Sequence, residues 1–211
     1  MTDLPPFFAI LGVLAVGTVS PGPRFVFVAR TSIARSRRDG LAAALGMGVG
    51  GVIFALLALL GLRAVLVQQG WVYAALRLAG GIYLLYLALA LWRGAALPLA
   101  APAALPARGS GLGRSFAAGL LTQLSNPKTA AVYGSVFAAL LPAQPAAWLF
   151  GALPATILFL EAGWYAVVAM SFSAGRPRAL YAAGKRWIDR AAGGIMAALG
   201  ARLVVEALRP S

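Results

Sequence analysis

The chain has 211 residues, 61% of them hydrophobic and only 11% charged, with a mean hydropathy of +0.85; this excludes an ordinary soluble domain, in which about a quarter of the residues are charged. The net charge of +13 comes from cations that lie between long apolar blocks, so it indicates membrane topology in a lipid bilayer, and no nucleic-acid partner is expected. The lack of cysteine and histidine excludes disulfides, thiolate metal sites and the commonest general base, and we expect neither a metal site nor a cofactor.

Six apolar segments have the roughly 20 residues that are needed to cross the core of a bilayer. They cover residues 5–28, 41–62, 71–92, 115–141, 145–170 and 191–208. The first has no basic region before it and no convincing cleavage site, so we expect a retained span rather than a signal peptide. The predicted fold class is an all-α integral membrane protein with six transmembrane helices in a single membrane domain.

The first span is interrupted by a short sequence that contains two prolines and a glycine. Proline removes a backbone donor and clashes with the preceding turn, and in hydrocarbon the freed backbone groups need partners. The exposed amides and carbonyls of a broken helix can hold a polar solute. Arg24 could attract an anionic or carboxylate group, or it could extend the basic loop to the headgroups, and the position at the headgroups is favoured. The candidate substrate-binding residues at this break are Ser20, Pro21, Gly22, Pro23 and Arg24.

The second span carries small residues at a spacing that suits helix packing. Gly46, Gly50 and Gly51 lie within it, and Gly40 lies just before it. Glycines at such positions let neighbouring helices approach closely. Packing is favoured over direct substrate contact, and a homo-oligomer that uses this surface stays open.

A linker rich in proline, alanine and glycine, residues 93–113, separates the third span from a fourth that is also interrupted. The candidate substrate-binding residues at this second break are Ser125, Asn126, Pro127 and Lys128. Lys128 lies about mid-span, too deep to reach the headgroups easily. An ionisable residue in a span is a functional hypothesis by default. Lys128 either pairs with a substrate carboxylate or is a structural cation with a buried partner.

The two breaks fall in the first span of each half of the chain, residues 5–92 and 114–208. Because each half has three spans, the second half enters the membrane from the opposite side, as in an inverted repeat. Paired proline-interrupted spans in corresponding positions point to the binding site of a transporter. We therefore expect two inverted three-helix repeats, each with a broken first helix, and a zwitterion held between the breaks. Two simple proline kinks are the alternative.

The fifth span contains Glu161, the only acidic residue in the central part of any predicted span. A carboxylate that is removed from water holds a proton more readily, so it can bind and release one near neutral pH. With no histidine available, Glu161 is the leading candidate for proton coupling. It could also bind a substrate ammonium, or form a static ion pair with Lys128 or Arg24.

The basic residues are concentrated in three of the connecting segments, which predicts an orientation. These segments are the loop after the first span, the linker and a segment at residues 176–190 that we expect to be a loop, partly an interfacial helix. The positive-inside rule places all three in the cytoplasm and both termini outside. Near the end of the chain, Arg202 and Glu206 are spaced for an ordinary contact within one helix.

An ordered set of motifs over nearly the whole chain resembles the LysE/RhtB-type amino acid exporters. The motifs are SPGP at 20–23, GLAAALGMGVG at 40–50, LGL at 60–62, LRLAGGIYLLYLALALWR at 76–93, SNPK at 125–128 and RWIDRAAGGIMAALGARL at 186–203. The resemblance implies a six-span transporter in the bacterial inner membrane that exports amino acids or related solutes and is driven by the proton gradient.

Three departures from the family pattern bear on the substrate. The family usually has asparagine where this chain has Arg24, commonly has aromatic residues and then Pro-Gln-Phe where residues 133–145 read YGSVFAALLPAQP, and often has a glycine near Ser36. A cation at position 24, if it lined the pathway, would repel cationic substrates. Neutral or acidic amino acids are therefore favoured over lysine and arginine.

Other function classes remain as alternatives at this point. Ser125 and Lys128 are three residues apart, and a Ser–Lys pair can support acyl transfer in an intramembrane enzyme, although Pro127 lies between them and no oxyanion device is readable. An exporter of a different small solute or of a metal ion is another alternative, and so is an accessory membrane subunit.

Overall fold

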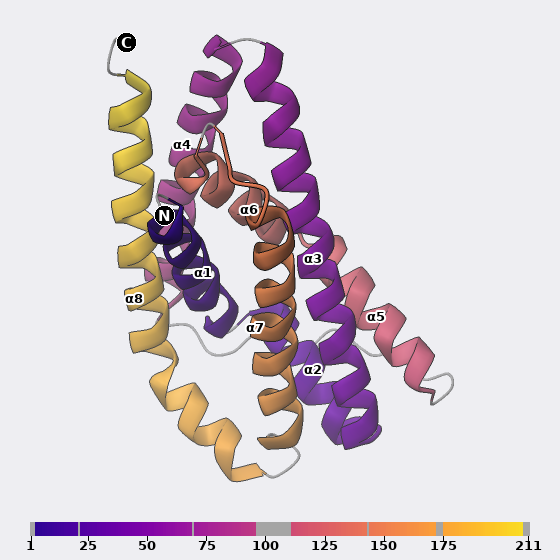
Figure 1. The fold of residues 1–211 in the computed structure, drawn as a ribbon. Coiled ribbons are helices and arrows are strands. Elements are labelled where there is room, and N and C mark those ends of the chain that lie inside the picture. Colours follow the sequence, from indigo (N-terminus) through magenta and orange to yellow (C-terminus); the bar gives the residue numbers. More distant parts are fainter. Residues whose placement is uncertain are drawn as a thin grey trace.

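A computed structural model describes residues 3–20, 22–68, 70–95, 111–142, 144–171 and 175–208. These residues form eight helices and no strand, so the all-α prediction is confirmed (Figure 1). The helices are α1 (Leu4–Val19), α2 (Pro23–Ala34), α3 (Arg37–Gln68), α4 (Gly70–Gly94), α5 (Leu112–Leu124), α6 (Pro127–Leu140), α7 (Leu149–Ser171) and α8 (Gly175–Leu208).

Three segments in the described part of the chain are long and apolar enough to cross a membrane: Arg37–Gly61, Leu149–Ser171 and Gly184–Leu208. Helices α1 and α2 together make a fourth candidate span, which is bent by 54° at its break. A shorter apolar helix, Leu78–Gly94, lies in α4. Helical segments of this length and hydropathy are those of a polytopic membrane protein.

Both predicted interruptions are real breaks between helices. Helix α1 ends at Val19 and α2 begins at Pro23, while α5 ends at Leu124 and α6 begins at Pro127. Each new helix starts with proline, whose missing N–H is not needed in the first turn and whose φ is already helical. The fourth apolar segment is therefore two helices, separated by Ser125 and Asn126, rather than one continuous helix.

The structure differs from the expected boundaries at two places. Helix α2 continues to Ala34, beyond the expected end of the first span at residue 28. Helix α8 begins at Gly175, so the basic segment that was expected to be largely a loop is helical and continuous with the last span. Alanine, arginine and lysine are strong helix formers, and they dominate this segment, so the charge run does not end the helix.

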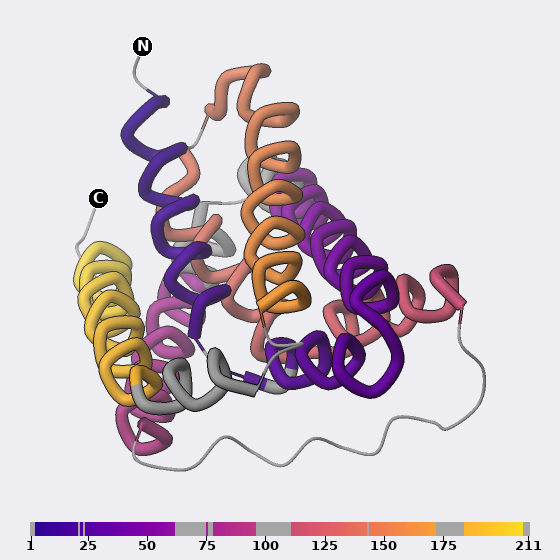
Figure 2. The backbone as a smooth tube through the Cα atoms, turned by 90° about the horizontal axis from the view of Figure 1, so that it is seen from below, coloured from indigo at the N-terminus to yellow at the C-terminus, as the bar shows by residue number. Residues whose placement is uncertain are grey.

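Helix α3 packs along α7 and α5, and α4 packs along α8 and α6. Figure 1 shows that α3 and α7 run in opposite directions, and Figure 2 shows the broken helix α1–α2 and the helices α7 and α8 from below. Two groups of buried apolar side chains result, one centred on residues such as Ile10, Leu84 and Val136 and the other on Phe25, Met47 and Tyr165. Glu161 lies on α7 between Ile157 of the first group and Tyr165 of the second, so it sits where the two apolar groups meet.

The packing role predicted for the glycines of the second span is seen most clearly where α3 crosses α5. A Cβ on Gly46 would collide with the carbonyl oxygen of Phe116, and one on Gly119 would collide with the carbonyl oxygen of Ala43. The two backbones therefore touch, which only glycine permits. Further along α3, Gly51 lies against the carboxylate of Glu161, so a side chain there would push into the polar site.

Candidate functional site

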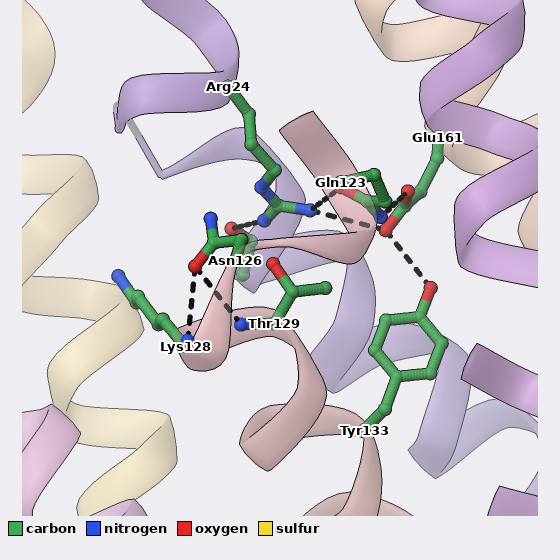
Figure 3. A network of polar contacts seen from close by, with 8 residues as sticks. Arg24, Gln123, Asn126, Lys128, Thr129, Tyr133 and Glu161 are labelled. Carbon is green, nitrogen blue, oxygen red and sulfur yellow. Dashed lines mark hydrogen bonds and ion pairs between the residues drawn. The ribbon is translucent and has the colours of Figure 1, made fainter. Parts of the chain in front are cut away.

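The carboxylate of Glu161 is buried within the helix bundle, with 1% of the side chain exposed. Three polar side chains surround it (Figure 3). Tyr133 Oη donates to Oε1 at 3.0 Å, Gln123 Nε2 donates to Oε2 at 2.5 Å, and Arg24 Nη1 lies 3.5 Å from Oε1. A buried carboxylate is costly unless it is paired and hydrogen-bonded. Both oxygens have partners here, and those partners come from α2, α5 and α6.

Arg24, at the first break, is held by four groups. Its Nη1 donates to Gln123 Oε1 at 3.0 Å and lies near Glu161, its Nη2 is 3.5 Å from the carbonyl oxygen of Gly17, and its Cζ lies 5.9 Å from the ring centroid of Tyr165. The side chain is only 14% exposed. The expected position at the headgroups is therefore wrong, because the start of α2 at residue 23 directs this cation toward α5 and α7 rather than along the basic loop.

The second break is organised by Asn126, which caps α6. Its Oδ1 accepts from the backbone N–H of Lys128 at 3.0 Å and of Thr129 at 3.4 Å, as Figure 3 shows. An asparagine in this position satisfies amides that have no partner inside the helix. Pro127 is the first residue of α6 and is exposed. Ser125 is also exposed, and its hydroxyl donates to the carbonyl of Leu121 at 2.6 Å.

Lys128 and Thr129 line a small cavity that Arg24, Tyr133 and Glu161 also line. Lys128 is half-buried, and within the described residues its ammonium has no hydrogen-bond or ion-pair partner. The charges of Arg24 and Asp189 both act on it through space. Both expectations for this lysine, a partner for a substrate carboxylate and a structural cation, therefore stay predictions.

The first break is attached to α8 through its serine. Ser20 Oγ donates to Asp189 Oδ1 at 2.8 Å, and Lys185 Nζ lies 2.8 Å from Asp189 Oδ2 and 2.7 Å from the carbonyl oxygen of Gly94. Ser20, Lys185 and Asp189 are all buried. The neighbouring candidates do less: Gly22 and Pro23 form the cap and first residue of α2, and Pro21 lies outside the described residues.

The structure thus brings three of the sequence candidates to one cavity, Arg24, Lys128 and Glu161. Sequence reasoning missed Gln123, Thr129 and Tyr133, which complete the site. Each is a polar residue in a predicted span, and polar groups inside a span are worth inspecting for that reason. It also missed Asp189, which was read as part of a basic segment.

The cavity has a volume of about 20 Å³ in this conformation. That is room for one water molecule and not for an amino acid, so a substrate enters only when the surrounding helices move apart. Leu14 of α1 and Met196 of α8 line the same cavity.

A larger cavity of about 530 Å³ lies between α3, α4 and α6. It is lined by apolar and small residues such as Leu57, Gly80 and Phe137, with Tyr83 and Ser135 as its polar side chains and no charged residue. A zwitterion placed there would lose its water shell without gaining charged partners. We therefore assign the binding of a polar solute to the small cavity. Within the described residues no group of acidic side chains could hold a metal ion.

Comparison with known proteins gives a consistent set of relatives. A protein family described as the LysE type translocator matches residues 15–207. A threonine efflux protein of Salmonella typhi is 35% identical over 201 residues, which cover 95% of this chain and 98% of the relative. A threonine efflux protein of Escherichia coli K12 is 34% identical with the same coverage. The uncharacterized membrane protein YahN of the same strain is 28% identical, covering 98% of this chain and 92% of the relative. No solved structure matches the chain significantly.

Proposed function

The chain belongs to the LysE type translocator family, and we propose that it is a secondary transporter that exports amino acids or related small zwitterions across the bacterial inner membrane. Because the family consists of translocators, the chain is a transporter and not an intramembrane enzyme. The hydroxyl of Ser125 also donates to the carbonyl of Leu121 in the preceding turn rather than to Lys128. Amino acids are the favoured substrate class because the relatives with 34% and 35% identity are named threonine efflux proteins.

The observation that carries this proposal is the gathering of charges from the two breaks at one cavity. Arg24 comes from the first break, Lys128 from the second, and Glu161 faces both from α7. A zwitterion needs an anionic and a cationic partner when it leaves water. Lys128 is positioned to take the carboxylate, and Glu161 is positioned to take the ammonium. Two cations against one carboxylate disfavour a second positive charge on the substrate, so neutral amino acids are preferred.

Six spans in two inverted halves are the architecture that we propose, with α1–α2, α3 and α4 in the first half and α5–α6, α7 and α8 in the second. Helix contacts support this pairing. A two-fold axis between such halves brings α3 against α7 and α4 against α8, and these are among the most extensive contacts in the described structure. It also relates α2–α7 to α3–α6 and α1–α6 to α2–α5, and all four pairs are in contact. The symmetry is approximate, because α3 packs on α5 more extensively than α1 packs on α7.

We place the basic segments in the cytoplasm and both termini outside. Figure 1 has the start of α3, the end of α7 and the start of α8 toward one end of the molecule and the C-terminus at the other. The arginines and lysines of residues 30–38 and 176–190 lie near these helix ends in the sequence. Cytoplasmic loops carry the excess of such residues.

Proton antiport follows if Glu161 takes a proton and a substrate ammonium in turn. A protonated Glu161 no longer attracts an ammonium, and an ammonium bound to the carboxylate blocks protonation. Proton and substrate then occupy alternate states of the same site, which is what an antiporter needs. Helix movement around the cavity, by rocking of one half against the other, opens the site to each side in turn.

Counterflow in proteoliposomes that contain the full chain tests this proposal. We expect saturable exchange of threonine and other neutral amino acids, and accumulation driven by a pH gradient. Lys128→Ala should raise KM by about tenfold or more, because a charged hydrogen bond is lost. Glu161→Gln should remove the effect of the pH gradient, while Glu206→Gln, which removes a carboxylate near the end of α8, should leave it unchanged.

The outcomes separate the parts of the proposal. No exchange of any neutral, acidic or basic amino acid by a folded preparation overturns amino acid export. Exchange that still responds to the pH gradient in Glu161→Gln overturns only the proton-coupling role of that residue.

A further inference from the structure

Thr129 lies in the first turn of α6, and its hydroxyl is in an unusual position for a threonine of a helix. The residue is 3% exposed. Its Oγ1 is fully buried and has no hydrogen-bond partner among the described residues. Buried polar side-chain atoms nearly always have a partner, so an orphaned one calls for an explanation.

Two other threonines of the chain provide an internal comparison. Thr31 Oγ1 bonds the carbonyl of Phe27 at 2.8 Å, and Thr122 Oγ1 bonds the carbonyl of Ala118 at 2.7 Å. Both use the carbonyl one turn back, which is the usual solution inside a helix. Thr129 makes no such bond, and the residue one turn back, Ser125, belongs to the end of α5 and lies before the start of α6. The break in the helix therefore leaves this hydroxyl free.

Thr129 is one of the residues that line the cavity, together with Arg24, Lys128 and Glu161. Figure 3 shows Thr129 on the side of α6 that faces Arg24 and Asn126. The ammonium of Lys128, which is the preceding residue, also has no partner among the described residues. An uncommitted hydroxyl donor, an uncommitted cation and the positive end of a helix dipole are thus adjacent. A carboxylate group satisfies all three.

We propose that Thr129 is a specificity-determining residue that donates its hydroxyl proton to the carboxylate of the transported substrate, beside Lys128. This inference rests on the proposed function, since it assigns one more residue to the same site. The cavity of about 20 Å³ takes one water molecule as it stands. A water there can occupy the place of one carboxylate oxygen, and the carboxylate replaces it when the helices around the cavity separate.

A substrate-binding role and a structural role for the Thr129 hydroxyl predict different effects on stability. Removal of a hydroxyl that supports the fold lowers the stability of the protein. Removal of a hydroxyl that has no partner in the substrate-free protein does not lower the stability, since an apolar group of the same shape suits a buried site at least as well. Thr129→Val keeps the shape and removes the hydroxyl, whereas Thr129→Ser keeps the hydroxyl.

The test combines the thermal stability of the purified full chain with counterflow in proteoliposomes. For Thr129→Val we expect an unchanged or raised Tm without substrate and a KM for threonine raised about tenfold to a hundredfold, the loss expected for a hydrogen bond to a charged group. Thr129→Ser should stay within about threefold of the wild-type KM. The penalty should be equal for threonine and valine, because these substrates share the carboxylate and differ in the side-chain hydroxyl. It should disappear for threoninol, used as a competitor, which lacks the carboxylate.

Each other result overturns the inference in a recognisable way. An unchanged KM in Thr129→Val means that the hydroxyl serves only a bound water. A penalty for threonine but not for valine means that it contacts the substrate side chain, and a lowered Tm means that it supports the fold. If wild type exchanges no amino acid, the proposed function fails and this inference with it. If wild type exchanges threonine and Thr129→Val does so equally well, only this inference fails.

Discussion

The two helix breaks have similar sequences but are held in different ways. Each has a serine just before a proline and a cation just after it. At the first break the serine, Ser20, reaches across the fold to Asp189, 169 residues away. At the second break the serine, Ser125, bonds the carbonyl of Leu121 in its own helix. Similar local sequences thus give one break that is fixed by tertiary contacts and one that is fixed locally.

The tertiary contacts at the first break form a buried cluster that joins three elements. Asp189 of α8 accepts from Ser20 with one oxygen and pairs with Lys185 through the other, and Lys185 also reaches the carbonyl of Gly94 at the end of α4. The end of α1 is thereby tied to α8 and α4. Movement of the first break requires that this cluster be broken or carried along with α8.

The local contacts at the second break leave groups uncommitted. Asn126 satisfies two amides at the start of α6, but Thr129 and Lys128 keep a hydroxyl and an ammonium without partners in the described part of the chain. A break that is stable without tertiary ties can present such groups to a solute. A repeated motif therefore need not have repeated contacts: the first break is tied to α8 through Ser20, and the second leaves the hydroxyl of Thr129 without a partner among the described residues.

The largest effect is expected from removing the cation of the buried cluster. Lys185→Ala leaves the carboxylate of Asp189 buried with Ser20 as its remaining polar partner among the described residues. Breaking a buried ion pair by removing one partner costs about 3–5 kcal/mol. We therefore expect a loss of that order in the free energy of unfolding, measured by chemical denaturation in detergent micelles.

Arg202→Ala is the matched control, because Arg202 and Glu206 form a pair of the same spacing on the same helix, but the arginine is 69% exposed. Exposed pairs of this kind contribute about 0.3–0.5 kcal/mol. Equal losses from Lys185→Ala and Arg202→Ala would show that the cluster at the first break does not anchor it.

The next effect concerns the serine of the first break. Ser20→Ala removes the hydrogen bond to Asp189 and leaves one oxygen of a buried carboxylate without its donor. A hydrogen bond to a charged group contributes about 1.5–3 kcal/mol, and we expect a loss in that range in the same denaturation experiment. Ser20→Thr keeps the hydroxyl in an extended backbone position (ψ 126°) and should recover most of the stability. A threonine variant as unstable as the alanine variant would place the cause in the backbone instead.

The positions of both breaks could be predicted from the sequence, because proline acts locally and its effect on a helix needs no knowledge of the fold. Glu161 and Arg24 could be selected because charges are rare inside apolar segments. The partners could not be predicted. Gln123 lies 99 residues from Arg24, and Asp189 lies 169 residues from Ser20, so these contacts depend on how helices pack.

Asp189 could not be selected from the sequence for a further reason, which is the charge of its neighbours. It stands among Lys185, Arg186 and Arg190, and this run reads as a basic loop. Continuation of α8 through the run places Lys185 and Asp189 one turn apart on a buried face, while Arg186 and Arg190 are exposed. A charge count describes the exposed face correctly and hides the buried one, so helical periodicity has to be tested in charged segments as well as in apolar ones.

A smaller effect is expected at the cap of the second break. Asn126→Ala leaves the amides of Lys128 and Thr129 without their acceptor, and loss of such a cap costs about 1 kcal/mol. Asn126→Asp keeps the cap and should leave stability nearly unchanged. Its carboxylate adds a negative charge beside Lys128, so it should raise the KM for an amino acid in counterflow. A KM unaffected by Asn126→Asp would argue against a carboxylate subsite at the start of α6.

The smallest effect is expected for the serine of the second break. Ser125 is exposed, and its hydroxyl bonds a carbonyl one turn back, at Leu121. Such a bond competes with water and slightly weakens a helix end rather than supporting it, so Ser125→Ala should change the free energy of unfolding by less than about 0.5 kcal/mol. Threonine counterflow should also be unchanged. If Ser125→Ala abolished counterflow while stability was preserved, the serine would have to turn toward a substrate in another conformation, and the two breaks would then be alike in function despite their different contacts here.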